Sequence, residues 1–74
     1  MSVKYAVIYE RATENWAAYV PDLPGCMTTG KTLEETMANI QEAVRGHLET
    51  MRLFGDPIPE PCSLAGEVEI ISAA

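Results

Sequence analysis

Side chains that could hold a metal ion or form a disulfide framework are scarce in this sequence of 74 residues. It contains two cysteines, Cys26 and Cys62, and a single histidine, His47. A structural zinc site needs several such ligands, often with a Cys-x-x-Cys pair that is missing here, so we expect neither a metal site nor a cofactor. The two cysteines are far apart and follow no pattern, which is typical of reduced thiols in a cytoplasmic protein.

Long apolar runs are also missing. No run approaches the roughly 18 apolar residues of a membrane-spanning helix, and residues 1–10 lack the apolar stretch and the cleavage site of a signal peptide. We therefore expect a cytoplasmic protein that makes no contact with a membrane.

Basic residues are few. Five lysines and arginines stand against eleven acidic residues, which gives a formal net charge of −6. This balance argues against direct binding of nucleic acid, because contacts to phosphates need a basic surface. It suits a basic protein partner, although surplus carboxylates also keep small proteins soluble.

The length allows one domain, residues 1–74, with a small core. Domains of this size usually gain stability from disulfides, metal ions or oligomerisation. Because the composition disfavours the first two, we expect the chain to associate with itself as a dimer or tetramer.

Four segments have the composition or the alternation of β-strands. Residues 3–10 are rich in β-branched and aromatic side chains and are apolar on both faces, which is typical of a central strand or of one that meets a partner. The other three segments are residues 16–21, 26–30 and 67–72.

Turn and capping residues mark the connections between these segments. Pro24 and Gly25 predict a type II turn with positive φ at the glycine. Thr32 and Glu35 form a Thr-x-x-Glu capping box, so a helix should begin directly after Thr32. Gly55 should end that helix as its C′ residue.

The region between these caps has one apolar face at helical spacing. That face consists of Leu33, Met37, Ile40, Val44, Leu48 and Met51. Gly30 is interpreted as a structural residue before the cap, and Gly46 as a point of close contact between helix and sheet. The order β-β-β-α-β predicts an α+β fold, with a small antiparallel sheet and one long helix packed on one of its faces.

Few side chains are placed for chemistry. Glu10 and Asp22, on or just after neighbouring strands, are the candidates for the divalent-cation site of a nuclease. Two dispersed acids rarely make such a site, so we favour solvated surface carboxylates and no catalytic residue. His47 and Cys26 lack partners for acid–base or nucleophilic chemistry and are interpreted as packing side chains.

Contacts to a partner are the more promising role for the exposed side chains. One helix covers only one side of a sheet, so part of the apolar surface should remain open to another protein. We predict that Tyr9, Trp16, Tyr19 and Asp22 bind a partner, while noting that aromatic rings serve a small core equally well.

The segment YVPDLPGCMTTGKTLEETMANIQEAV carries a family pattern: an aromatic or apolar strand, an Asp-Leu-Pro-Gly-Cys turn, a glycine before the Thr-x-x-Glu cap, and a helix. With the later DPIPEP, it resembles the N-terminal domain of HicB-type antitoxins over residues 5–61. The resemblance implies a partly degraded ribonuclease-H-like fold without nuclease activity. It also implies a partner, a small basic HicA-type toxin that cleaves mRNA and whose active site the antitoxin covers.

Relatives of this type often continue into a DNA-binding module, for which residues 1–74 leave no room, so we do not expect autorepression by this chain alone. Three interpretations follow. The first is an antitoxin that sequesters a toxin, and the second is a homo-oligomeric structural or regulatory relative without a toxin. The third, least favoured, is a Mg²⁺-dependent nuclease that uses Glu10 and Asp22.

Overall fold

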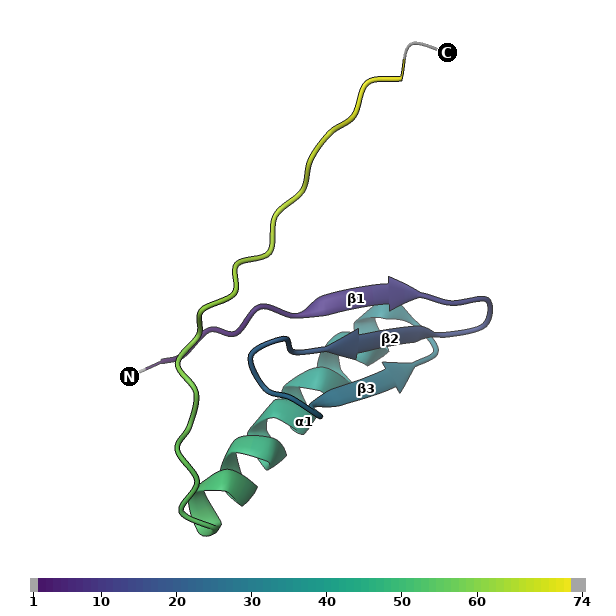
Figure 1. Ribbon diagram of the computed structural model, residues 1–74. Helices are drawn as coiled ribbons and strands as arrows, with labels where there is room; N and C mark the ends of the chain where they lie inside the picture. Colours follow the sequence, from purple (N-terminus) through teal and green to yellow (C-terminus); the bar gives the residue numbers. More distant parts are fainter. Residues whose placement is uncertain (1, 73–74) are drawn as a thin grey trace.

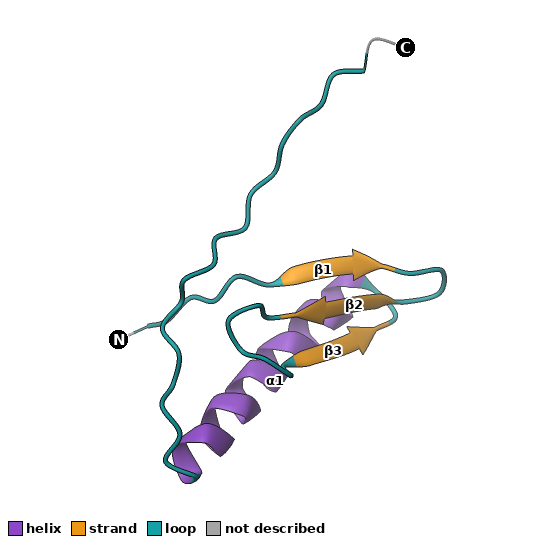
Figure 2. Cartoon of the chain, viewed as in Figure 1, coloured by secondary structure: helices purple, strands orange, loops and turns teal. Residues whose placement is uncertain are grey.

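The fold is a three-stranded antiparallel sheet with one long helix on one face. The computed structural model describes residues 2–72, with strands β1 (Ile8–Arg11), β2 (Trp16–Tyr19) and β3 (Met27–Gly30) and helix α1 (Leu33–Leu53). The strand order is β1-β2-β3, and α1 packs against β2 and β3 (Figures 1 and 2). The predicted α+β class is confirmed. Within the described residues, no helix has the length and apolar character to cross a membrane.

β1 and β2 form a hairpin with a polar loop. The N–H of Ala12 donates to the carbonyl of Asn15 at 2.8 Å and closes the loop. At the end of the hairpin the Arg11 guanidinium lies over the Trp16 ring, 5.9 Å from its centroid, in a cation–π contact. β1 begins later than predicted because residues 3–7 belong to no strand ladder.

The turn at Pro24 and Gly25 forms as predicted. Gly25 has φ +84°, and the N–H of Cys26 donates to the carbonyl of Leu23 at 3.0 Å across the turn, which fits a type II geometry. Leu23 is completely buried, so the turn also supplies a core side chain.

Gly30 ends β3 at the point where the strand comes closest to α1. A Cβ atom on Gly30 would lie 2.5 Å from Thr36 Oγ1 and 2.8 Å from the Thr36 backbone nitrogen. Thr36 is itself completely buried, and its hydroxyl donates to the carbonyl of Thr32 at 2.8 Å. Packing against α1, not an unusual backbone angle, therefore requires glycine at position 30.

Thr32 is the N-cap of α1, as predicted. Its backbone is extended, and its hydroxyl accepts a hydrogen bond from the N–H of Glu35 at 3.0 Å. The Glu35 carboxylate reaches back to the N–H of Lys31 at 3.4 Å, one residue before the position expected in a reciprocal capping box. The acidic side chain also lies where negative charge complements the helix dipole.

The buried face of α1 is centred on Ile40. Around it lie the buried side chains Ala18, Val20, Leu23 and Cys26 and the half-buried Ala43, Val44 and Leu48. The predicted apolar face is wrong at Met37, which is 49% exposed, because Thr36 occupies the buried position one residue earlier. The predicted close contact at Gly46 is also wrong, since a Cβ atom there would have no neighbour within 4 Å.

α1 ends in a Schellman motif at Gly55. This glycine has φ +71°, and its N–H donates to the carbonyl of Arg52 at 3.2 Å. The N–H of Asp56 donates to the carbonyl of Met51 at 2.9 Å. The two bonds satisfy carbonyls that the helix end would leave unpaired, and Gly55 is the C′ residue that the sequence predicted.

The post-helix segment, residues 57–71, forms no helix or strand. The predicted fourth strand, residues 67–72, is therefore wrong as an element of this sheet. The chain passes the N-terminal residues and then runs away from the sheet (Figure 1). A strand must pair with a neighbour and bury its apolar face. Residues 67–71 are paired with no strand of this chain, and Val68 and Ile70 are exposed.

Candidate partner-binding surface

The strand register divides the sheet into a helix-covered face and an open face. Paired residues of neighbouring strands point to the same side, and Ala18, which belongs to the core around Ile40, marks the covered side. Tyr9 and Thr28 pair with Ala18 and share that side. The alternate residues form the open face: Ile8, Glu10, Ala17, Tyr19, Met27 and Thr29.

A row of apolar side chains crosses the open face. Ile8 pairs with Tyr19, and Tyr19 pairs with Met27, so the three side chains lie next to one another across all three strands. We call these three residues the open-face row. Tyr19 is 39% exposed and Met27 is 66% exposed. Because α1 packs on the opposite side of the sheet, this row is accessible to another protein.

Two of the four residues predicted to bind a partner lie on the helix-covered face. Tyr9 is half-buried and packs against the core. Trp16 pairs with Gly30 on the same side and carries Arg11 over its ring. Tyr19 is thus the one predicted aromatic residue that belongs to the open face.

Asp22 ties the post-helix segment to the connection between β2 and β3. Its Oδ2 accepts hydrogen bonds from the backbone N–H groups of Cys62 at 2.9 Å and Ser63 at 3.0 Å. Its Oδ1 accepts from the Ser63 hydroxyl at 2.7 Å and from the Cys62 thiol at 3.1 Å. We call this set of four bonds the Asp22 clamp. Both oxygens are engaged within the chain, and the predicted contact of Asp22 with a partner stays a prediction.

The clamp changes the acidity of its members. The hydrogen bonds from Ser63, and then those from Cys62, hold the pKa of the Asp22 carboxyl far below its usual range. Each bond favours the charged carboxylate over the neutral acid. In turn, the hydrogen bond to Asp22 and the negative charge of that carboxylate raise the pKa of the Cys62 thiol, so Cys62 remains a thiol that donates its proton to the clamp.

A second tie holds the post-helix segment at Tyr5, whose hydroxyl donates to the carbonyl of Pro59 at 2.5 Å. Sequence reasoning missed both ties. They join residues 54 positions apart at Pro59 and 40 or 41 positions apart at Asp22, and no local pattern reports such a distance. The nearest signal was the position of Asp22 directly after a strand end.

The fold does not bring together the two carboxylates considered for a metal ion. Glu10 lies opposite Ala17 within the hairpin, whereas Asp22 follows β2 beyond Tyr19, which pairs with Ile8 at the other end of β1. Among the described residues, no three histidine, cysteine, aspartate or glutamate side chains gather as a metal site would need. This placement gives no support to a nuclease site at Glu10 and Asp22.

Cys26 and His47 line one shared groove beside α1, without a hydrogen bond between their side chains in the described part of the chain. Cys26 was predicted as a half-buried side chain within a strand, but it is buried in the core directly before β3. Burial raises the pKa of its thiol, which disfavours the nucleophilic thiolate. His47 is half-buried and lines a groove between the turn at Pro24 and the second half of α1. Neither residue forms a nucleophile with an adjacent base.

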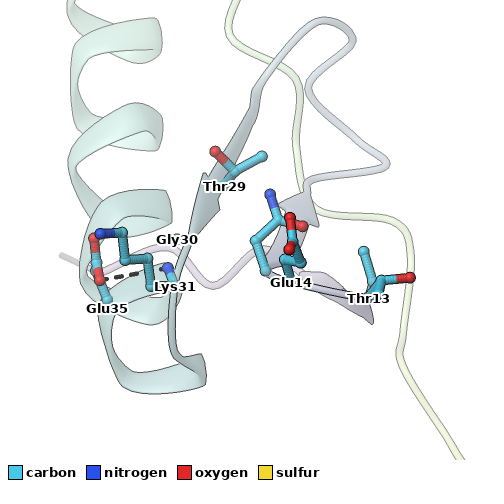
Figure 3. Close-up of a pocket in the computed structure, with 8 residues that line it drawn as sticks. Thr13, Glu14, Thr29, Gly30, Lys31 and Glu35 are labelled. Carbon is cyan, nitrogen blue, oxygen red and sulfur yellow. Dashed lines mark hydrogen bonds between the residues drawn. The ribbon is translucent and has the colours of Figure 1, made fainter.

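An open hollow lies between the hairpin loop and the start of α1 (Figure 3). Residues 12–15 line one side, and Thr29, Gly30, Lys31 and Glu35 line the other. Most of the residues that line the hollow are polar and they carry charges of both signs, with Glu35 directed back to the Lys31 backbone. The hollow lies at the hairpin-loop end of the sheet, whereas the open-face row crosses the opposite end of the strands.

Comparison with known proteins gives the family of this fold. Residues 5–70 match the model of the HicB-like antitoxins of bacterial toxin–antitoxin systems. A UPF0150 protein of Thermoplasma acidophilum is 40% identical over 58 residues, which cover 77% of this chain and 84% of that protein. Antitoxin HicB 2 of Photorhabdus laumondii is 29% identical over 82 residues, which cover 96% of this chain and 59% of that antitoxin.

The solved structure of a HicA3 and HicB3 toxin–antitoxin complex contains a similar chain. The two folds match with a TM-score of 0.70 and 30% sequence identity, over 80% of this chain and 69% of that chain. Together with the family match over residues 5–70, this similarity agrees with the resemblance carried by the turn, the cap and the helix. The chain therefore belongs to the HicB-like antitoxin family.

Proposed function

We propose that this chain is a non-catalytic antitoxin module of the cytoplasm that binds and neutralises a small basic HicA-type toxin that cleaves mRNA. Its family and its likeness to a chain of the HicA3 and HicB3 complex support this role. The net charge of −6 suits a basic partner, because complementary charge steers association. We regard the sheet and helix as a partly degraded ribonuclease-H-like fold.

The observation that carries the proposal is the open-face row. Protein interfaces have an apolar centre with polar and charged groups around it. Here Tyr19 and Met27 supply an exposed apolar centre, and Glu10 lies on the same face of the sheet. A basic protein can bury the row and place its own charged groups against Glu10.

Two methionines give a matched pair of variants for the test. Met27 lies in the open-face row and is 66% exposed, whereas Met37 lies on α1 and is 49% exposed. Each variant of this chain is co-expressed with a HicA-type toxin, taken from beside its own gene if one is encoded there, and co-purification and growth are measured. We expect Met27→Lys to weaken binding at least about 10-fold, the effect of losing a central interface side chain, and Met37→Lys to bind as the unmodified chain does.

Two results would contradict the proposal in different ways. Equal binding by both variants would remove the open face as the binding surface. Failure of the unmodified chain to bind or to protect cells would remove the antitoxin role, and the homo-oligomeric relative without a toxin would then be the better interpretation.

The non-catalytic part of the proposal has its own assay. The placement of Glu10 and Asp22 on separate parts of the hairpin supports it. We expect the purified chain to leave RNA and RNA–DNA hybrids intact in the presence of Mg²⁺. Cleavage that disappears in the Glu10→Ala, Asp22→Ala double variant would show instead that these carboxylates form a phosphoryl-transfer site.

A further inference from the structure

The end of the post-helix segment carries a group of strongly exposed apolar side chains. Residues 64–71, here called the tail, include Leu64, Val68, Ile70 and Ile71, and each of these is at least 80% exposed. Their order is that of a strand, because Val68 and Ile70 share one face while Glu67 and Glu69 share the other. An apolar stretch of this kind on a soluble protein marks an interaction site.

The sheet offers an unpaired edge beside the tail. β1 pairs with β2 along one side only, so its outer edge presents backbone N–H and C=O groups without a partner strand. A shallow hollow separates Val7, Ile8 and Tyr9 from tail residues 65–67. Free edges of this kind are templates for the addition of another strand.

The side chains at the edge match the pattern of the tail. Val7 and Tyr9 lie on the helix-covered side, and Ile8 lies on the open side. A strand placed beside them with Val68 and Ile70 on the covered side continues the apolar surface across one more position of the sheet. A strand added to the edge of a sheet gains both backbone hydrogen bonds and burial of its side chains.

The path of the tail favours the edge of a second molecule over the edge of its own. Tail residues 65–67 lie beside Val7, Ile8 and Tyr9 of the same chain, but Val68, Ile70 and Ile71 beyond them are at least 80% exposed. The apolar face of the tail is therefore unpaired in the single chain, and a second copy offers an equivalent edge for a reciprocal exchange.

The root of the tail also points outward. The Asp22 clamp fixes Cys62 and Ser63 against the body of the molecule. Residues 65–67 then pass beside the β1 edge, and after them the chain runs away from its own sheet (Figure 1). Eight extended residues span roughly 26 Å at about 3.3 Å per residue, which is enough to reach the edge of a neighbouring molecule.

We propose that residues 67–71 form a β-strand that pairs with the outer edge of β1 in a second copy of this chain, and that the exchange is reciprocal. The dimer then has the fourth strand that the sequence pattern predicts, contributed by its partner. This proposal does not rest on toxin binding, because it uses the backbone edge of β1 and the tail. The antitoxin role was assigned to the open-face row, which shares Ile8 with that edge.

Two double variants test the proposal by sedimentation velocity over a range of concentrations. Val68→Lys with Ile70→Lys places charge on the apolar face of the tail, and Glu67→Lys with Glu69→Lys is the control on the opposite face of the same strand. We expect the full chain to be a dimer at tens of micromolar. The first variant should raise the dimer dissociation constant about 100-fold or more, as expected from the loss of two buried apolar side chains, while the control should remain dimeric.

Nuclear magnetic resonance then identifies the strand that occupies the edge. In a mixture of isotope-labelled and unlabelled full-length chains, we expect intermolecular cross-peaks between the tail and β1. A monomeric unmodified chain, or a dimer that the first double variant leaves intact, would overturn the proposal. Cross-peaks between tail and β1 within one molecule only, or none between them, would overturn it as well.

Discussion

The body of the molecule, residues 8–56, and the post-helix segment differ in what fixes their structure. In the body, the contacts at each connection lie close in sequence: Thr32 caps the helix that starts beside it, and Gly30 meets Thr36 six residues later. The post-helix segment is held at Asp22 and Tyr5, and beyond these ties its apolar side chains are exposed. The comparison shows that strand-like alternation alone does not make a strand, because the segment must also be paired with the edge of a sheet.

The largest effect should come from the contact between Gly30 at the end of β3 and Thr36 on α1. Gly30→Ala would place a Cβ atom 2.5 Å from Thr36 Oγ1 and 2.8 Å from its backbone nitrogen. Backbone of a helix cannot move aside cheaply, so we expect a loss of about 3 kcal/mol in the free energy of unfolding, at the upper end of ordinary overpacking. Urea unfolding followed by circular dichroism measures this loss.

Gly66→Ala is the matched control in the tail, where a Cβ atom would have no neighbour within 4 Å. Its free energy of unfolding should stay within about 0.5 kcal/mol of the unmodified chain. An equal change in the free energy of unfolding for both substitutions would mean that Gly30 is no more tightly packed than Gly66.

The helix cap should give the next largest effect. Thr32→Ala removes the acceptor for the N–H of Glu35, and loss of such a cap costs about 1 kcal/mol of stability. Thr50→Ala makes the same change near the other end of α1, at an exposed position where alanine is the better helix former. Thermal unfolding should therefore show a lower Tm for the first variant and an unchanged or higher Tm for the second.

Gly46 is a second glycine of the body, and it has the free space around it that Gly30 lacks. Because a Cβ atom at this helical position meets nothing within 4 Å, Gly46→Ala should raise the free energy of unfolding by about 0.8 kcal/mol, the difference in helix propensity. A lower free energy of unfolding in urea would instead show that the groove beside His47 requires the space that glycine leaves.

How far the sequence predicted this structure depends on the range of each contact. The Pro24–Gly25 turn, the Thr32 cap and the Gly55 helix end follow from local chemistry, and all three are confirmed. Gly46 misled because a glycine in a helix has the same sequence signature whether it faces a sheet or open space. The fourth strand failed because its pattern says nothing about where its partner lies.

The candidate site was predictable to a smaller extent. That one sheet face stays open follows from having a single helix, but the row that crosses it depends on the pairing of Ile8, Tyr19 and Met27. Register links three separate strands, and alternation within each strand does not determine it. The Asp22 clamp was hidden for the same reason, because its donors lie 40 and 41 residues away.

The smallest effect on global stability, and the most local one, concerns the Asp22 clamp itself. Asp22→Asn leaves one acceptor oxygen where four donors from Cys62 and Ser63 converge. We expect the amides of Cys62 and Ser63 to exchange hydrogen at least about 10-fold faster, as for a locally opened segment, while urea unfolding of the body is unchanged. Asp56→Asn removes the same charge outside the clamp and serves as the control.

The dependence of this protection on pH follows from the lowered pKa of Asp22. A carboxyl whose pKa is lower in the folded chain contributes its full stabilisation above its ordinary pKa of about 4 and loses it as pH falls through the lowered value. Protection of the Cys62 and Ser63 amides, corrected for intrinsic exchange, should therefore be constant from neutral pH to about pH 4 and decrease in stronger acid. In Asp22→Asn this acid-induced loss should be absent, because the amide does not titrate. A loss of protection centred near pH 6 in the unmodified chain would show that a group other than Asp22 holds the post-helix segment against the body.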